Sequence, residues 1–104
     1  MRIDFFDDVL VKFIKSLEKQ TIAKIMREID LLEKFGHRLD MPHSKKIFHN
    51  LFELRVRGIQ EVRIFYTFFG ERAVLLHGFI KKSRKIPPRE RALAMRKLNR
   101  LTGI

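Results

Sequence analysis

The spacing of hydrophobic and polar positions changes along this chain, and each spacing predicts one type of element. Residues 2–6 alternate weakly, as a short strand does. Apolar side chains three and four residues apart follow over 9–17, after an aspartate suited to cap a helix. The same spacing returns over 19–35, where Gly36 is placed to end the helix. The first third of the chain therefore predicts a strand followed by an amphipathic helical hairpin.

Beyond the hairpin the helical spacing is lost, and residues 37–48 are predicted to form a loop with local positive charge. Strand patterns follow over 51–57, 62–69 and 74–82, where alternation or β-branched and aromatic residues prevail. Two prolines then suit the start of a last helix, whose apolar stripe continues up to Gly103.

This order of elements, β, α, α, β, β, β, α, predicts a single α+β domain over residues 1–104. We expect an antiparallel sheet with the helical hairpin on one side and the C-terminal helix beside it. The chain is long enough for one core and too short for two.

The turn at Gly70-Glu71 predicts how the last two strands pair. A two-residue hairpin with glycine first would pair Phe69 with Arg72 and, continuing the ladder, Arg63 with Gly78.

That register assigns the basic side chains to faces of the sheet. Lys82 would share the face of Arg63, whereas His77 and Lys81 would lie on the opposite face. Arg55 would join Arg63 if the loop around Gly58 has an odd number of residues, and would lie on the other face if the number is even.

Positive charge is abundant and unevenly placed. The chain has 23 Lys and Arg against 12 Asp and Glu, a formal net charge of +11, and residues 81–104 contain nine of the basic residues and one acidic residue. Clustered basic charge is typical of nucleic-acid binding, although an anionic membrane or an acidic protein would be attracted by the same field. Solvated surface charge is the remaining interpretation.

Several kinds of chemistry lack their residues. There is no cysteine, so disulfides and thiolate metal sites are excluded. The four histidines have no plausible metal spacing, and no glycine-rich phosphate loop or serine-nucleophile motif is present. We therefore expect neither metal nor cofactor. Aspartates interrupt the N-terminal run early, which argues against a signal peptide or a membrane span and favours the cytoplasm.

Arginine and lysine held on a rigid sheet can still stabilise the charge that develops on a phosphoryl group. RNA supplies its own nucleophile, because its 2′-hydroxyl can attack the adjacent phosphate once it is oriented and deprotonated. Cleavage of RNA is thus within reach of these residue types.

Three ordered motifs resemble a known family: Leu-Phe-Glu-Leu-Arg at 51–55, Arg-Ile-Phe-Tyr at 63–66 and Val-Leu-Leu-His-Gly-Phe-Ile-Lys-Lys at 74–82. They are similar to the RelE/HigB toxins of type II toxin-antitoxin systems, in particular the phage Gp49-like branch of the RelE/ParE superfamily. The resemblance implies a RelE/ParE-like domain that acts as a ribosome-dependent, metal-independent endoribonuclease, cleaving mRNA and inhibiting translation. It also implies a helix-turn-helix antitoxin as partner, beside mRNA and the ribosome, and no membrane.

The resemblance also suggests catalytic residues. Arg63 matches the arginine expected to contact the scissile phosphate, and Lys82 matches the basic residue that stabilises the transition state. Arg55 matches the arginine of the Glu-Leu-Arg motif. Glu53 is either the general base or merely the ion-pair partner of Arg55.

Other basic residues would bind the RNA backbone: Lys81, Lys45, Lys46, Arg57 and Lys85. A basic face of the last helix would contact ribosomal RNA or be covered by an acidic antitoxin: Lys85, Arg89, Arg91, Arg96, Lys97 and Arg100. His77, inside an apolar strand, is more often a satisfied core histidine than a proton donor, and Tyr66 is expected to pack in the core.

Two other functions fit the same fold. A ParE-like toxin would inhibit DNA gyrase without a nuclease centre, and a catalytically inactive module would bind nucleic acid without forming products.

Overall fold

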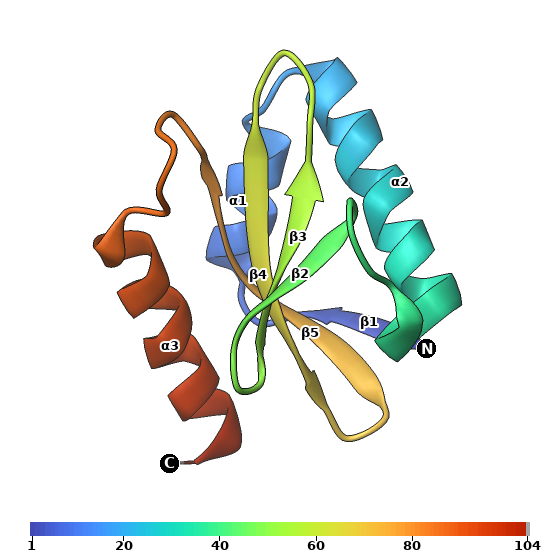
Figure 1. The fold of residues 1–104 in the computed structure, drawn as a ribbon, viewed down its shortest axis with the longest axis vertical. Helices are drawn as coiled ribbons and strands as arrows, with labels where there is room; N and C mark the ends of the chain where they lie inside the picture. The colour runs from blue at the N-terminus through green and yellow to red at the C-terminus, as the bar shows by residue number, and fades with distance from the viewer. Residues whose placement is uncertain (104) are drawn as a thin grey trace.

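A computed structural model describes residues 1–103 of the chain, and its centre is a five-stranded sheet in the order β1-β5-β4-β3-β2 (Figure 1). Strand β1 (Arg2–Phe5) pairs in parallel with β5 (Arg72–Ile80). The remaining strands, β4 (Val62–Phe69), β3 (Leu51–Val56) and β2 (Ser44–Phe48), continue the sheet in antiparallel fashion. The α+β prediction is confirmed, but the sheet is mixed rather than antiparallel because the first strand adds to β5 in the same direction.

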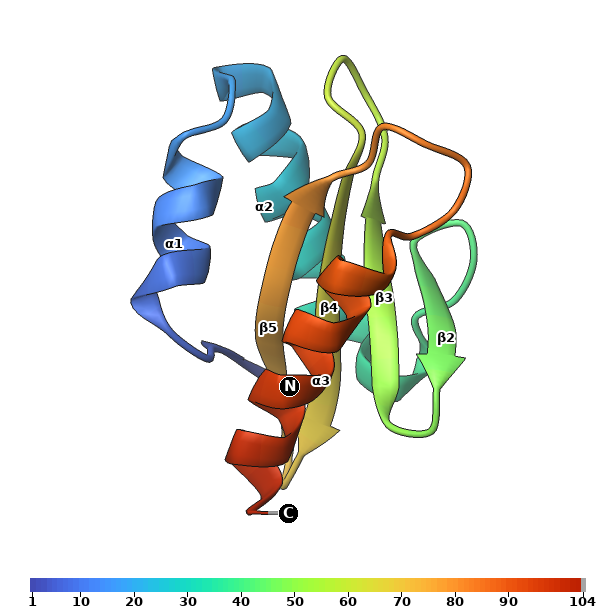
Figure 2. The same cartoon turned by 90° about the vertical axis from the view of Figure 1, so that its left-hand side faces the viewer.

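Three helices cover both faces of this sheet. The predicted hairpin consists of α1 (Asp8–Lys15) and α2 (Lys19–Phe35), followed by a short 3₁₀ turn at Gly36–Arg38. The last helix, α3 (Pro88–Thr102), lies on the opposite face: in Figure 2 it lies in front of the sheet, and α2 runs behind it. The expected placement of the last helix beside the hairpin is therefore wrong, since the sheet separates them.

The helix ends follow from particular residues. Asp7 caps α1 by accepting a hydrogen bond from the backbone N–H of Leu10 at 3.1 Å. Gly36, with a positive φ of 53°, ends α2, and a proline occupies the first turn of α3 where its missing N–H costs nothing. No helix within residues 1–103 is long and apolar enough to cross a lipid bilayer.

A separate hydrophobic cluster lies on each face of the sheet. The larger cluster joins the even-numbered side chains of β4 to the apolar stripes of α1 and α2. The smaller one joins Phe65 and Phe79 of the sheet to Ala94 and Leu98 of α3. Tyr66 is buried in the larger cluster, as predicted, and its hydroxyl is hydrogen-bonded to Ser44. Burial raises the pKa of this phenol above its ordinary value.

Part of the predicted loop is a strand. Residues 44–48 form β2, whose Lys45 pairs with Glu53 of β3. Because β2 lies at the edge of the sheet and is mostly exposed, its sequence lacks the apolar alternation that reveals a half-buried strand.

A β-bulge changes the register between β4 and β5. The turn pairs Phe69 with Arg72 as predicted, but the ladder shifts by one residue between Phe65 and Tyr66, so that Arg63 pairs with Phe79 instead of Gly78. Leu76 is the extra residue on β5. The predicted pairing of Arg63 with Gly78 is therefore wrong.

The bulge also reverses the predicted faces. His77 and Lys81 lie on the face of Arg63, contrary to the prediction. Lys82, which was predicted to share that face, does not. Between β3 and β4 the loop has an odd number of residues, and Arg55 pairs directly with Arg63. The sheet face toward α3 thus gathers cations from three strands.

Candidate functional site

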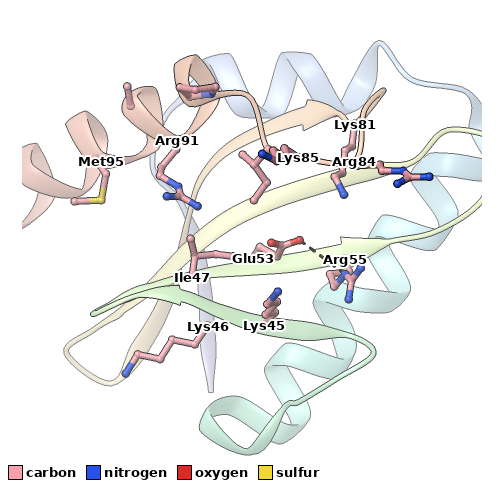
Figure 3. A pocket seen from close by; sticks show the side chains of 13 residues that line it. Lys45, Lys46, Ile47, Glu53, Arg55, Lys81, Arg84, Lys85, Arg91 and Met95 are labelled. Carbon is pink, nitrogen blue, oxygen red and sulfur yellow. Dashed lines mark ion pairs between the residues drawn. The ribbon is translucent and has the colours of Figure 1, made fainter.

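A pocket of about 630 Å³ opens on the α3 side of the sheet (Figure 3). Its walls come from β2 and β3 on one side and from the β5–α3 connection and the first turns of α3 on the other. Thirteen residues line it: Lys45, Lys46, Ile47, Glu53, Arg55, Lys81, Arg84, Lys85, Ile86, Pro88, Arg91, Ala92 and Met95.

The lining is strongly cationic. Seven of the thirteen residues are lysine or arginine, and Glu53 is the one acidic residue among them. Cations that converge from several elements on one concavity produce a positive potential that attracts phosphate groups. The pocket therefore suits a polyanion.

Glu53 lies in the middle of the pocket (Figure 3). Two arginines, Arg55 and Arg63, hold its carboxylate. Its Oε1 is 2.7 Å from Nε of Arg63 and 3.8 Å from Nε of Arg55, and its side chain is 6% exposed. The distances are those of ion pairs, but neither N–H forms a hydrogen bond with the oxygen. The contacts hold the carboxylate by charge and leave its oxygens able to accept a proton.

Arg55 faces the pocket with part of its donor capacity unused. Its Nε is buried and has no hydrogen-bond partner among the described residues, while Nη1 contacts the sulfur of Met41 at 3.4 Å. Burial, together with the charges of Arg63 and Arg57, lowers the pKa of Arg55 below its ordinary value. A guanidinium stays charged near neutral pH even so, and the exposed part of this side chain faces the pocket, where a phosphate oxygen could accept from it.

Arg63 is placed differently from its expected role. It is 1% exposed, it is not among the residues that line the pocket, and its Nη1 donates to Glu61 at 2.8 Å and to the carbonyl of Val62 at 3.2 Å. The side chain is thus occupied by Glu53, Glu61 and backbone. In this structure Arg63 supports the carboxylate of Glu53 from below.

Of the two adjacent lysines after β5, Lys81 enters the pocket and Lys82 does not. Lys81 is half-buried, whereas Lys82 is exposed. The bulge is the cause, because it brings the odd-numbered residues at the end of β5 to the face of Arg63.

Most of the expected RNA-binding residues meet at the pocket. Lys45, Lys46 and Lys85 line it, as Lys81 does. Arg57 is exposed beyond the end of β3 and is absent from the lining.

Sequence reasoning did not single out Arg84 or the aliphatic residues of the lining. Helical spacing could have found part of the set, since Pro88, Arg91, Ala92 and Met95 recur every three or four residues on one side of α3.

The predicted basic face of α3 is only partly a surface. Lys97 is 13% exposed, and its Nζ lies 3.0 Å from Asp7 and donates to the carbonyl of Leu76 at 3.0 Å. The guanidinium of Arg100 lies over the ring of Phe6. Lys97 therefore links α3 to the bulge at Leu76 and to the residue that caps α1. The prediction that Lys97 belongs to an RNA-facing surface is wrong.

The histidines lie away from the pocket lining. His77 forms a 2.8 Å contact with Glu90 of α3 and stacks on Phe79, as a satisfied core histidine does. His43 is similarly paired with Glu28. Within residues 1–103 no group of three or more His, Asp or Glu side chains is arranged to hold a metal ion.

The chain matches a protein-family model. Residues 12–99 fit the model of the family described as phage derived protein Gp49-like (DUF891), a range that includes every residue of the pocket lining. No curated protein matches the chain.

Proposed function

The chain belongs to the phage-derived Gp49-like family, and we propose that it is the toxin of a toxin-antitoxin pair, an endoribonuclease that cleaves mRNA on the ribosome without metal and so inhibits translation. The observation that carries this proposal is a pocket lined by seven cations around one buried carboxylate. Such a site offers the two things that cleavage by the 2′-hydroxyl of RNA requires, a proton acceptor and a stabiliser of phosphate charge.

Glu53 is the proposed general base. Its carboxylate takes the proton of the 2′-hydroxyl, and the 2′-oxygen attacks the adjacent phosphorus. The bond to the 5′-oxygen breaks, leaving a 2′,3′-cyclic phosphate on one fragment and a 5′-hydroxyl on the other. Arg63 beneath Glu53 and Arg55 beside it hold this carboxylate in place.

The cations complete the proposed reaction. Arg55, which lines the pocket beside Glu53, stabilises the negative charge that grows on the phosphate oxygens. An ammonium group at the rim, that of Lys81, protonates the leaving 5′-oxygen. Lys45, Lys46 and Lys85 hold neighbouring phosphates. In this mechanism Arg63 is a positioning residue and does not contact RNA.

The proposed partners follow from the same activity. mRNA in the ribosome is the substrate, the cytoplasm is the place of action, and a helix-turn-helix antitoxin neutralises the protein. An acidic segment of that antitoxin is complementary to the pocket's charge.

Primer extension on mRNA bound to purified ribosomes, with chelator present, tests the proposal. We expect new cuts in the decoding site with the wild-type protein, and a loss of about 100-fold or more in Glu53→Gln and Arg55→Ala. Arg57→Ala, an arginine on the same strand end but outside the pocket, should cut normally.

Three outcomes would contradict it. Cuts that persist in both pocket variants would remove Glu53 and Arg55 from the mechanism. RNA binding without products would make the protein an inactive binding module. An absence of cuts on ribosomes and on free RNA would end the nuclease assignment, and inhibition of gyrase supercoiling would then be the assay to run.

A further inference from the structure

The pocket has two unlike ends, and the mechanism above leaves the aliphatic side chains of one end without a role. Figure 3 shows Arg55, Arg84 and Lys81 toward one end, the cationic end, and Met95 with Ile47 toward the other, where Arg91 and Lys46 also lie. Glu53 lies between the two ends. Phosphate chemistry accounts for the cations of both ends but not for the apolar surface at the second, which we call the aliphatic end.

The aliphatic end is held rigidly by the fold. Ile47 and Met95, like the lining residue Ile86, are partly buried and pack against the smaller hydrophobic cluster beneath α3. Pro88 and Ala92 add apolar surface from the same side of the helix. Side chains packed on one side and open to the pocket on the other present a preformed apolar wall, as ligand sites do.

We propose that this aliphatic end is a base-binding subsite for single-stranded RNA, which takes the nucleobase of a nucleotide whose phosphate lies at the cationic end. A nucleobase has apolar faces and is joined to its phosphate by one sugar, so one nucleotide would span both ends of the pocket. The pocket volume of about 630 Å³ is within the range of small-ligand sites. A paired base is stacked in its helix and could not enter, so the subsite selects unpaired RNA.

None of the thirteen lining residues is aromatic. The base would therefore be held by van der Waals contact with Ile47 and Met95 rather than by stacking on a ring. Such contact strengthens the binding of any nucleotide that has a base, but discriminates only weakly among the four bases.

Binding to a short 2′-O-methyl RNA oligomer tests the subsite, since the methyl group blocks the nucleophile and binding is measured without cleavage. The comparison is the same oligomer with abasic residues, which keeps every phosphate. By fluorescence anisotropy at low salt, the wild-type protein should bind the base-containing oligomer about five- to tenfold more tightly than the abasic one.

Two variants should abolish this difference while leaving the affinity for the abasic oligomer unchanged: Met95→Gln and Ile47→Thr. Their matched controls are Met26→Gln on α2 and Ile59→Thr in the β3–β4 loop, both exposed and away from the pocket. The controls should keep the wild-type ratio. Thermal unfolding shows whether each variant is folded. If one pocket variant does not fold, the other is sufficient for the test.

The inference rests on the proposed function in placing RNA in this pocket, but the two can fail separately. Equal affinity for both oligomers in the wild-type protein, or an unchanged ratio in a folded pocket variant, overturns the base subsite even if ribosomal mRNA is cut. A base-dependent ratio that the pocket variants remove supports the subsite even if no cleavage is found.

Discussion

Arg63 and Glu53 face one another from neighbouring strands, with Nε 2.7 Å from Oε1 and both side chains almost completely buried. The resemblance suggested that Arg63 contacts the scissile phosphate, but the structure places it against Glu53 instead. This buried arginine fixes the carboxylate, and Arg55, further out, faces the pocket. Loss of activity in an Arg63 variant would therefore not by itself show contact with RNA.

Replacement of Arg63 by Met should destabilise the protein by about 3–5 kcal/mol, because it removes the close partner of a buried carboxylate. The free energy of unfolding from urea denaturation measures this. The double variant Arg63→Met with Glu53→Gln should recover part of the loss, since the uncompensated charge is then gone. A change within about 0.5 kcal/mol in Arg63→Met would show that the pair has no structural role.

Lys81→Ala should lower the rate of mRNA cleavage by at least about tenfold, because it removes an ammonium group from the pocket lining. Lys82→Ala removes the same charge from the next residue, which is exposed and outside the pocket lining. This variant should change the rate less than about twofold. Single-turnover cleavage of ribosome-bound mRNA gives both rates. The opposite order would mean that the bulged register does not hold in solution.

Gly78→Ala should cost about 1–3 kcal/mol of stability, since a Cβ there would lie 2.9 Å from a ring carbon of Phe13 and 3.2 Å from Leu10. Glycine is required because α1 packs closely on β5. Phe13→Leu in the same chain removes the ring and should relieve the strain. Thermal unfolding of the single and double variants decides, and an unaffected single variant would refute the close packing.

Acid should destabilise the protein through Asp7. Burial acts to raise the pKa of Asp7, but the hydrogen bond from Leu10 and the charge of Lys97 outweigh it and hold the pKa below the ordinary value of 3.8. The unfolded chain therefore binds this proton more readily than the folded one. The stabilisation is present above the ordinary value of 3.8 and is lost as the pH falls through the lowered pKa.

Unfolding free energies at pH 6 and pH 3 check this expectation. Asn can still cap α1, so Asp7→Asn should fold but show a smaller difference between the two pH values. Arg72 and Arg2 lower the pKa of Asp4 in the same direction, so part of the acid sensitivity should remain in that variant. An unchanged pH dependence in Asp7→Asn would exclude Asp7 as a source.

The helices and the central hairpin could be predicted because their signals are local. The limits of α2 agree with the spacing of its apolar stripe and with Gly36, and the turn at Gly70 pairs Phe69 with Arg72. The edge strand β2 was missed because an exposed edge needs no apolar alternation. The addition of β1 to β5 depends on contacts between segments far apart in the sequence, such as Arg2 with Arg72, which no local pattern encodes.

The kinds of residue in the candidate site could be predicted from the sequence better than the places of their side chains in the structure. Glu53 and Arg55 do meet in a cationic pocket, as their shared motif suggested. The depth of Arg63 and the inward direction of Lys97 could not be foreseen, because both result from tertiary contacts that bury a cation against acids far along the chain or on another strand.

The extra residue at Leu76 bears on how functions are transferred between related proteins. It exchanges the faces of the two halves of β5, so that Lys81 rather than Lys82 turns toward Arg63. A relative without that residue would present the next position of the strand at the same place in space. A sequence alignment that pairs Lys81 and Lys82 with the basic residues of such a relative would then equate side chains on opposite faces of the sheet. Assignments at the end of this strand should be made from superposed backbones, with the bulge counted first.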